Sequence, residues 1–146
     1  MMGTKVHDVM TDNPRCVTPE TSVSDAAALM ESEDIGSLPV LDGEQLTGMI
    51  TDRDIVIRAI AKGKDPRGMP VREVASREIV TVHADDDLSE ALRLMATQQV
   101  RRLPVVDENN RLVGVLAQAD LAAAAKEKSV GEMVEEISKS PTGPRL

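Results

Sequence analysis

The hydrophobic positions along the chain predict two amphipathic helices. Apolar residues recur at the spacing of one helix face over residues 23–30 and again over residues 88–95. A polar start signal precedes each run, S-x-x-D over residues 22–25 and D-x-x-E over residues 87–90. The first side chain of such a signal accepts a hydrogen bond from a free N–H of the first helical turn, so we expect the helices to begin at these positions.

Shorter apolar runs predict strands on both sides of these helices. "RCVTP" (15–19) and "VTVHA" (80–84) contain the β-branched residues that favour short strands. "LPVLDGEQLTGMIT" (38–51) predicts a strand, a turn at the D-G pair and a second strand. "LPVVDENNRLVGVLA" (103–117) predicts the same hairpin with a longer turn.

The order of elements occurs twice because the sequence contains an internal repeat. A shift of 65 positions aligns "VHDVMT" with "VREVAS" and "VSDAAALM" with "LSEALRLM", and one extra residue in "ENNR" raises the shift to 66. Apolar helices over residues 54–61 and 120–125 end the two copies. Identical pairs include Leu29/Leu94, Met30/Met95, Pro39/Pro104, Asp42/Asp107, Gly48/Gly114 and Asp54/Asp120. Each copy is therefore a β-α-β-β-α unit, and the predicted fold class is α/β (α+β).

The repeat also predicts the domain organisation. Residues 6–62 form the first repeat and residues 71–126 the second, and the Gly- and Pro-containing residues 63–70 link them. A unit of about 55 residues buries too little surface to be stable alone, so we expect the copies to pack on each other with pseudo-twofold symmetry. Residues 127–146 form a C-terminal tail, in which "VGEMVEEI" (130–137) predicts a short helix.

The composition excludes nucleic acid as a partner. The 146 residues include 17 basic and 25 acidic side chains, and the formal net charge of −8 opposes the phosphate backbone that supplies most nucleic-acid affinity. The chain contains no Phe, Tyr or Trp, so it lacks the aromatic platforms on which single-stranded bases stack.

Other composition features predict a cytoplasmic protein without a metal site. No run approaches the roughly 20 apolar residues of a membrane span, and the N-terminus lacks the apolar region of a secretory signal. The lone Cys16 cannot form an intrachain disulfide or a cysteine-based metal cluster. "HADDD" (83–87) places an imidazole near three carboxylates, but acidic residues also suit the N-terminus of the helix that follows.

The segment "GMITDRDI" (48–55) carries the candidate chemistry. It predicts a strand that leads into a helix, with Thr51 and Asp54 at the corner. A carboxylate accepts hydrogen bonds from both hydroxyls of a diol, and the free N–H groups of a helix start can hold a phosphate. The second repeat keeps Gly114 and Asp120 but has Ala117 in place of the threonine, so we expect two sites of different affinity.

With these motifs the chain resembles a tandem pair of cystathionine β-synthase (CBS) domains, also called a Bateman module. The resemblance rests on "LPVLD…LTGMITDRDI" and "LPVVD…LVGVLAQADL" and covers about residues 6–126. "DRDIVIRAIAKGKDP" and "QVRRLPVV" are similar to small stand-alone bacterial members, some of them linked to hypoxia or stress. The resemblance implies two units packed through their sheets, commonly paired again in a homodimer.

The resemblance also implies two ligand clefts, each formed by both repeats. In this family the corner aspartate binds the ribose hydroxyls of an adenosyl ligand, and arginines suit its phosphate. The residues implied for cleft A are Thr51, Asp54, Ser76, Ile79, Val80, Arg101 and Arg102. Those implied for cleft B, which has no arginine and should be weaker or empty, are Thr11, Cys16, Gly36, Ser37 and Asp120.

Simpler interpretations of these residues stay open. Asp54 and Asp120 could only cap helices. Arg101 and Arg102 could be surface charges that pair with acidic neighbours. Thr51 could be an ordinary β-branched strand residue, since Ala117 replaces it in the other copy.

The leading hypothesis is a non-enzymatic regulatory module that binds AMP, ADP, ATP, adenosylmethionine or a dinucleotide and modulates a partner protein. An alternative is a stress-linked structural or interaction protein without a functional nucleotide site. An enzyme acting on nucleotides is disfavoured, because the sequence has no nucleophile–base pair and no Walker-type loop. The sequence selects neither the ligand nor the partner.

Overall fold

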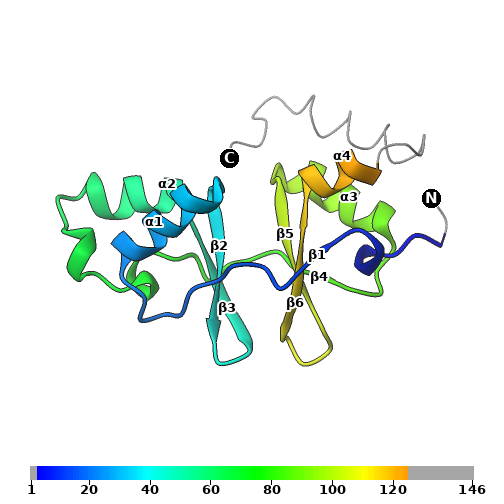
Figure 1. Ribbon diagram of the computed structural model, residues 1–146, viewed down its shortest axis with the longest axis horizontal. Coiled ribbons are helices and arrows are strands. Elements are labelled where there is room, and N and C mark those ends of the chain that lie inside the picture. Colours follow the sequence, from blue (N-terminus) through cyan, green and yellow to red (C-terminus); the bar gives the residue numbers. More distant parts are fainter. Residues whose placement is uncertain (1–2, 125–146) are drawn as a thin grey trace. The chain divides into compact units, whose positions relative to one another are not determined.

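The computed structural model describes residues 3–124, and the chain in it folds as two compact units (Figure 1). Residues 15–79 form one unit, which we call the repeat-1 unit. Residues 3–14 and 80–124 form the other, the repeat-2 unit. The predicted helix over 130–137 lies outside the described residues.

The repeat-1 unit contains one long helix, a hairpin and several short helical segments. In chain order these are α1 (Val23–Glu33), β2 (Ser37–Asp42), β3 (Gln45–Thr51), α2 (Asp52–Ile55), the π-helical η2 (Val56–Ile60), and the 3₁₀ segments η3 (Pro66–Gly68) and η4 (Val71–Glu73).

The repeat-2 unit has the corresponding elements. They are the 3₁₀ segment η1 (Val6–Asp8), β1 (Thr11–Asp12), β4 (Val82–His83), α3 (Leu88–Gln98), β5 (Arg102–Val106), β6 (Leu112–Ala117) and α4 (Gln118–Ala124). Mixed helix and strand content confirms the predicted fold class.

The two long helices begin where their start signals predict. Ser22 caps α1 by accepting a hydrogen bond from the Asp25 N–H at 3.0 Å. Asp87 also precedes its helix, but its side chain makes no capping bond. It pairs with Lys5 at 2.8 Å instead, because residues 3–14 pack beside this helix start.

The two hairpins confirm the predicted strand–turn–strand pattern. β2 pairs with β3 and β5 pairs with β6, both antiparallel, and both ladders shift register at equivalent places, Val40/Leu41 and Val105/Val106. The predicted strand over 80–84 is present as β4, which pairs parallel to β5. The predicted strand over 15–19 contributes only the bridge of Val17 to Val40, also parallel.

The same sheet arrangement is built in both units. In the repeat-2 unit the strand order is β1-β6-β5-β4. In the repeat-1 unit the hairpin is flanked by Ser76, bridged antiparallel to Met49, and by Val17, bridged parallel to Val40. Ser76 therefore stands where Thr11 stands in the other unit, at the same offset of 65 positions that relates the sequence repeats.

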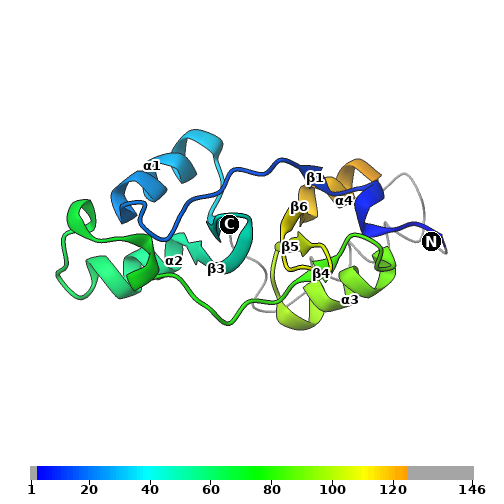
Figure 2. The same cartoon turned by 90° about the horizontal axis from the view of Figure 1, so that it is seen from below.

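The opening segments of the two repeats are exchanged between the units. Val6, at the start of repeat 1, is fully buried in the core of the repeat-2 unit with Leu88 and Leu103. Val71, at the start of repeat 2, is fully buried in the core of the repeat-1 unit with Leu38. Figure 2 shows the N-terminal segment, in blue, running beside β6. Each core therefore depends on residues from both repeats.

The helices that end each repeat begin two residues earlier than predicted. α2 and η2 together cover residues 52–60, and α4 begins at Gln118. Both follow directly from the preceding strand, so no loop separates strand from helix. Among the helices of residues 3–124, none has the length and apolar character needed to cross a membrane.

Candidate functional site

The corner of the repeat-1 unit lies where β3 runs into α2. Thr51 is the N-cap of α2, and its hydroxyl oxygen accepts a hydrogen bond from the Asp54 N–H at 3.0 Å. In return, Oδ2 of Asp54 accepts from the Thr51 N–H at 2.9 Å. These reciprocal bonds form a capping box, so Asp54 does have the local capping role that residue type suggests.

Capping leaves part of both side chains available. Oδ1 of Asp54 accepts no hydrogen bond within residues 3–124, and its nearest cation is Nε of Arg58 at 4.0 Å. The Asp54 side chain is 15% exposed, so solvent and small ligands can reach it. The Thr51 hydroxyl accepts a bond but donates none within the same range. The corner therefore offers a free carboxylate oxygen and a free hydroxyl proton.

Two further segments hold this corner in place. Ser37 lies directly opposite Thr51 in the β2–β3 ladder, and the Gly36 carbonyl accepts from the Asp52 N–H at 2.9 Å. On the other edge, Ser76 and Met49 exchange two backbone hydrogen bonds of 3.0 and 2.8 Å.

The corner of the repeat-2 unit uses its aspartate differently. Oδ2 of Asp120 accepts from the Ala117 N–H at 2.9 Å, as Asp54 does from Thr51. Oδ1 of Asp120, however, accepts from the Thr11 hydroxyl at 2.9 Å. Thr11 belongs to β1, which pairs with β6 through Val115. Both oxygens of Asp120 thus have a donor from within the same unit.

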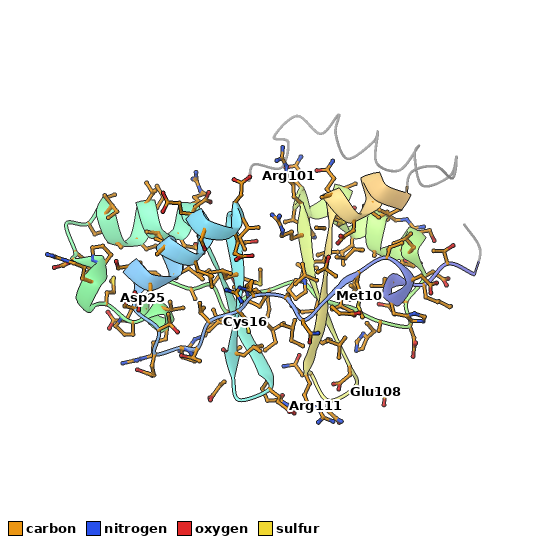
Figure 3. All side chains as sticks on the ribbon, viewed as in Figure 1. Met10, Cys16, Asp25, Arg101, Glu108 and Arg111 are labelled. Atoms are coloured by element: carbon orange, nitrogen blue, oxygen red, sulfur yellow. The ribbon has the colours of Figure 1, made fainter. Side chains whose placement is uncertain are left out.

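Arg101 and Arg102 lie beside this second corner in the repeat-2 unit. Arg102 is opposite Ala117 in the β5–β6 ladder, and the Arg101 carbonyl accepts from the Gln118 N–H at 2.8 Å. Figure 3 shows Arg101, which directly precedes the first residue of β5. Within residues 3–124 neither guanidinium forms an ion pair.

The residues predicted for each cleft divide between the two units. Of the cleft A set, Thr51, Asp54, Ser76 and Ile79 are in the repeat-1 unit, and Val80, Arg101 and Arg102 are in the repeat-2 unit. Of the cleft B set, Cys16, Gly36 and Ser37 are in the repeat-1 unit, and Thr11 and Asp120 are in the repeat-2 unit. Joint binding of one ligand by both subsets stays a prediction.

Two features of these corners were not predicted from the sequence. The hydrogen bond from Thr11 to Asp120 joins residues 109 positions apart, and no local pattern indicates it. The approach of Arg58 to Asp54 could have been predicted from the sequence, because residues four apart on a helix are neighbours.

Cys16 does not have the properties of a reactive thiol. Its side chain is exposed at the surface, but partial desolvation raises the pKa of its thiol, an effect that outweighs the opposing charge of Arg15. At neutral pH it is therefore a thiol and not a thiolate. Among residues 3–124, no group of three His, Cys, Asp or Glu side chains is placed to hold a metal ion.

A separate hollow of about 650 Å³ lies within the repeat-1 unit, near the turn of the β2–β3 hairpin. Its charged lining comes from Glu20, Asp42, Arg72 and Arg77, and Arg72 is paired with Glu20. None of the predicted cleft residues lines it, although Gly48, the first residue of the corner segment, does.

Comparison with known sequences decides the family. The profile of the CBS domain matches residues 6–60 and again residues 71–127. The chain belongs to the CBS domain family. It is a tandem CBS pair, that is, a Bateman module, as its motifs predicted.

Two relatives match the CBS pair over nearly their whole length. The CBS domain-containing protein YhcV of Bacillus subtilis is 42% identical over 134 residues, which cover 91% of this chain and 94% of YhcV. Hypoxic response protein 1 of Mycobacterium tuberculosis is 39% identical over 135 residues, with coverages of 92% and 94%.

Solved structures of CBS pairs contain different ligands. A structure of hypoxic response protein I with two coordinated zinc ions is 41% identical, with a TM-score of 0.75 and coverages of 82% of this chain and 98% of that one. CBSX2 in complex with AMP is 32% identical, with a TM-score of 0.75 and coverages of 85% and 97%. The CBS pair of MJ0100, in complex with 5′-methylthioadenosine and S-adenosylmethionine, is 28% identical, with a TM-score of 0.73 and coverages of 85% and 98%.

Proposed function

We propose that this protein is a non-enzymatic sensor that binds an adenine nucleotide or another adenosyl compound and modulates a partner protein. The observation that carries the proposal is the open Oδ1 of Asp54 at a helix start, beside a hydroxyl with a free proton. A ribose diol supplies the donors that this oxygen lacks. The complexes of CBSX2 with AMP and of MJ0100 with adenosyl compounds support this ligand class.

The proposed principal site is cleft A. In it, Asp54 and Thr51 contact the ribose, and Arg101 and Arg102 bind the phosphate as permanently charged planar donors. The absence of ion pairs on both arginines within residues 3–124 supports this role. The remaining residues proposed to line cleft A are Ser76, Ile79 and Val80. Cleft B is the weaker site and comprises Thr11, Cys16, Gly36, Ser37 and Asp120.

The proposed mechanism is differential binding. A ligand that holds one arrangement of the two CBS units more tightly than another shifts the population toward that arrangement. Couplings of this kind are typically about 1 to 3 kcal/mol, which is enough to alter the affinity for a partner several-fold.

The proposal also includes a homodimer. Val56, Ile57 and Ile60 on η2 are 53%, 46% and 54% exposed, which is unusual for large apolar side chains that neighbour one another. A second copy of the chain would cover them, and we expect sedimentation velocity to show a dimer. The finding of a monomer at micromolar concentration would remove this part of the proposal.

The function is tested by thermal shift with AMP, ADP, ATP and S-adenosylmethionine. We expect at least one compound to raise the melting temperature of the wild-type protein, because a ligand that binds only the folded state stabilises it. Asp54→Ala should remove most of the shift and leave only the small contribution of the weaker second corner, whereas Asp120→Ala should retain most of it.

The absence of a shift with every compound at millimolar concentration would contradict the proposal. It would favour the alternative of a structural or interaction protein without a nucleotide site. The expectation that the protein has no metal site stays a prediction, and repeating the assay with EDTA and with added zinc tests it.

A further inference from the structure

The two corner aspartates differ in how many internal donors they have. Asp54 accepts one hydrogen bond, from the Thr51 N–H at 2.9 Å. Asp120 accepts two, from the Ala117 N–H at 2.9 Å and from the Thr11 hydroxyl at 2.9 Å. An incoming diol therefore meets at Asp54 an oxygen that accepts no hydrogen bond, with Nε of Arg58 4.0 Å away, and at Asp120 an oxygen that already accepts one.

The difference comes from residues at equivalent positions of the repeat. Thr11 and Ser76 occupy the same place, each bridged to the second strand of a hairpin. The Ser76 hydroxyl donates to the Glu78 carbonyl at 3.3 Å and makes no hydrogen bond to Asp54. The Thr11 hydroxyl donates to Oδ1 of Asp120. The backbone arrangement is shared, so the two hydroxyls distinguish the corners by where they point.

We propose that Thr11 is the residue that lowers the affinity of the second corner, because its hydroxyl occupies the Asp120 oxygen that a ribose diol needs. This inference rests on the proposed function and concerns only the repeat-2 unit. To bind, a diol must displace the Thr11 hydroxyl or share the oxygen with it. Displacement exchanges one hydrogen bond to the carboxylate for another, so its net cost is that of an ordinary hydrogen bond, about three- to tenfold in affinity.

Ala117 adds to the effect of Thr11. At the first corner Thr51 supplies a free hydroxyl proton in addition to the open oxygen. At the second corner Ala117 has no hydroxyl, so the ligand gains no compensating contact there. Thr11 thus controls access to Asp120, the aspartate of the second corner.

The test uses full-length protein in the Asp54→Ala background, where the first corner is disabled, and adenosine as the probe. Adenosine has the diol but no phosphate, so the arginines do not obscure the result. Isothermal titration calorimetry should show that adding Thr11→Val tightens adenosine binding by about three- to tenfold. Further addition of Asp120→Ala should abolish binding.

Several controls accompany this experiment. Thr97→Val removes an exposed threonine hydroxyl of the same unit, which donates to the Arg93 carbonyl, and should leave the affinity unchanged. 2′-Deoxyadenosine lacks the diol, so Thr11→Val should not tighten its binding. Circular dichroism confirms folding, and Thr11→Ala replaces Thr11→Val if the valine variant does not fold.

Unchanged or weaker adenosine binding in the Thr11 variants would overturn the inference, since it would mean that the hydroxyl is neutral or contacts the ligand itself. The proposed function fails by a different result, namely that the wild-type protein binds none of the adenosyl compounds through Asp54. The two failures are therefore distinguishable.

Discussion

At the scale of single residues, Gly48 and Gly114 show why the corners have their geometry. A Cβ on Gly48 would lie 2.6 Å from the Ser76 carbonyl oxygen, and one on Gly114 would lie 2.8 Å from the Thr11 carbonyl oxygen. Only glycine, which has no Cβ, lets the segments that contain Ser76 and Thr11 approach these strands so closely. The sequence showed both glycines in the repeat, but not what approaches them.

Gly48→Ala should lower the free energy of unfolding by about 1–3 kcal/mol, as overpacking does elsewhere. The methyl group would meet a backbone oxygen that cannot move without disturbing the Ser76 and Met49 hydrogen bonds. Urea denaturation measures the change. Gly68→Ala is the matched control, because a Cβ there meets nothing within 4 Å, and it should be neutral or stabilising. Equal effects of both substitutions would contradict the argument.

At the scale of elements, the turn of the β5–β6 hairpin is organised by one carboxylate. Oδ1 of Asp107 accepts from the backbone N–H groups of Asn109 and Arg111 at 2.8 and 3.0 Å. The Arg111 N–H is the largest cause that lowers the pKa of Asp107 below its usual 3.8, and the Asn109 N–H acts in the same direction. Figure 3 shows Glu108 and Arg111 at this exposed hairpin end.

The pKa of Asp107 is lower in the folded state than its ordinary value of 3.8, so the charged carboxylate stabilises the folded protein above pH 3.8. This stabilisation is lost as the pH falls through the pKa that Asp107 has in the folded state. Asp107→Asn should therefore be less stable than the wild type at neutral pH, and the difference should shrink as the medium is acidified below that ordinary value. Urea denaturation at a series of pH values measures it. A difference independent of pH would show that the carboxylate charge does not matter.

At the scale of the whole molecule, the exchange of opening segments couples the two repeats. The 3₁₀ segments η1 and η4 carry Val6 and Val71 into the core of the unit built mainly from the other repeat. Neither unit can be completed from one sequence repeat, so the chain needs both copies to fold.

Val6→Ala should destabilise the protein by about 2 kcal/mol, because it removes fully buried methyl groups. Hydrogen exchange followed by mass spectrometry should locate the loss of protection in β5 and β6, in the other sequence repeat. Val71→Ala is the reciprocal control and should affect β2 and β3. Loss of protection mainly in β2 and β3 after Val6→Ala would contradict the exchange.

The sequence by itself determined the repeat, the two long helices, the two hairpins and the residues at the two corners. These features follow from short-range rules: helical and strand periodicity, caps, turns and the spacing of a strand-to-helix junction. The same rules failed at Asp87, whose side chain binds Lys5, 82 positions away, and does not cap the helix that follows.

Only the tertiary structure decided that Asp54 keeps an oxygen without a hydrogen-bond donor, whereas both oxygens of Asp120 have one. The hydroxyl that donates to Asp120 belongs to Thr11, which is 109 positions away in the sequence. Ser76, the equivalent of Thr11 in the other unit, donates its hydroxyl to the Glu78 carbonyl instead. Partners so far apart are brought together by strand pairing and core packing, not by local preference. Two corners that look alike in sequence therefore differ in chemistry, since the fold supplies a hydroxyl donor to Oδ1 of Asp120 but places only Nε of Arg58, at 4.0 Å, near Oδ1 of Asp54.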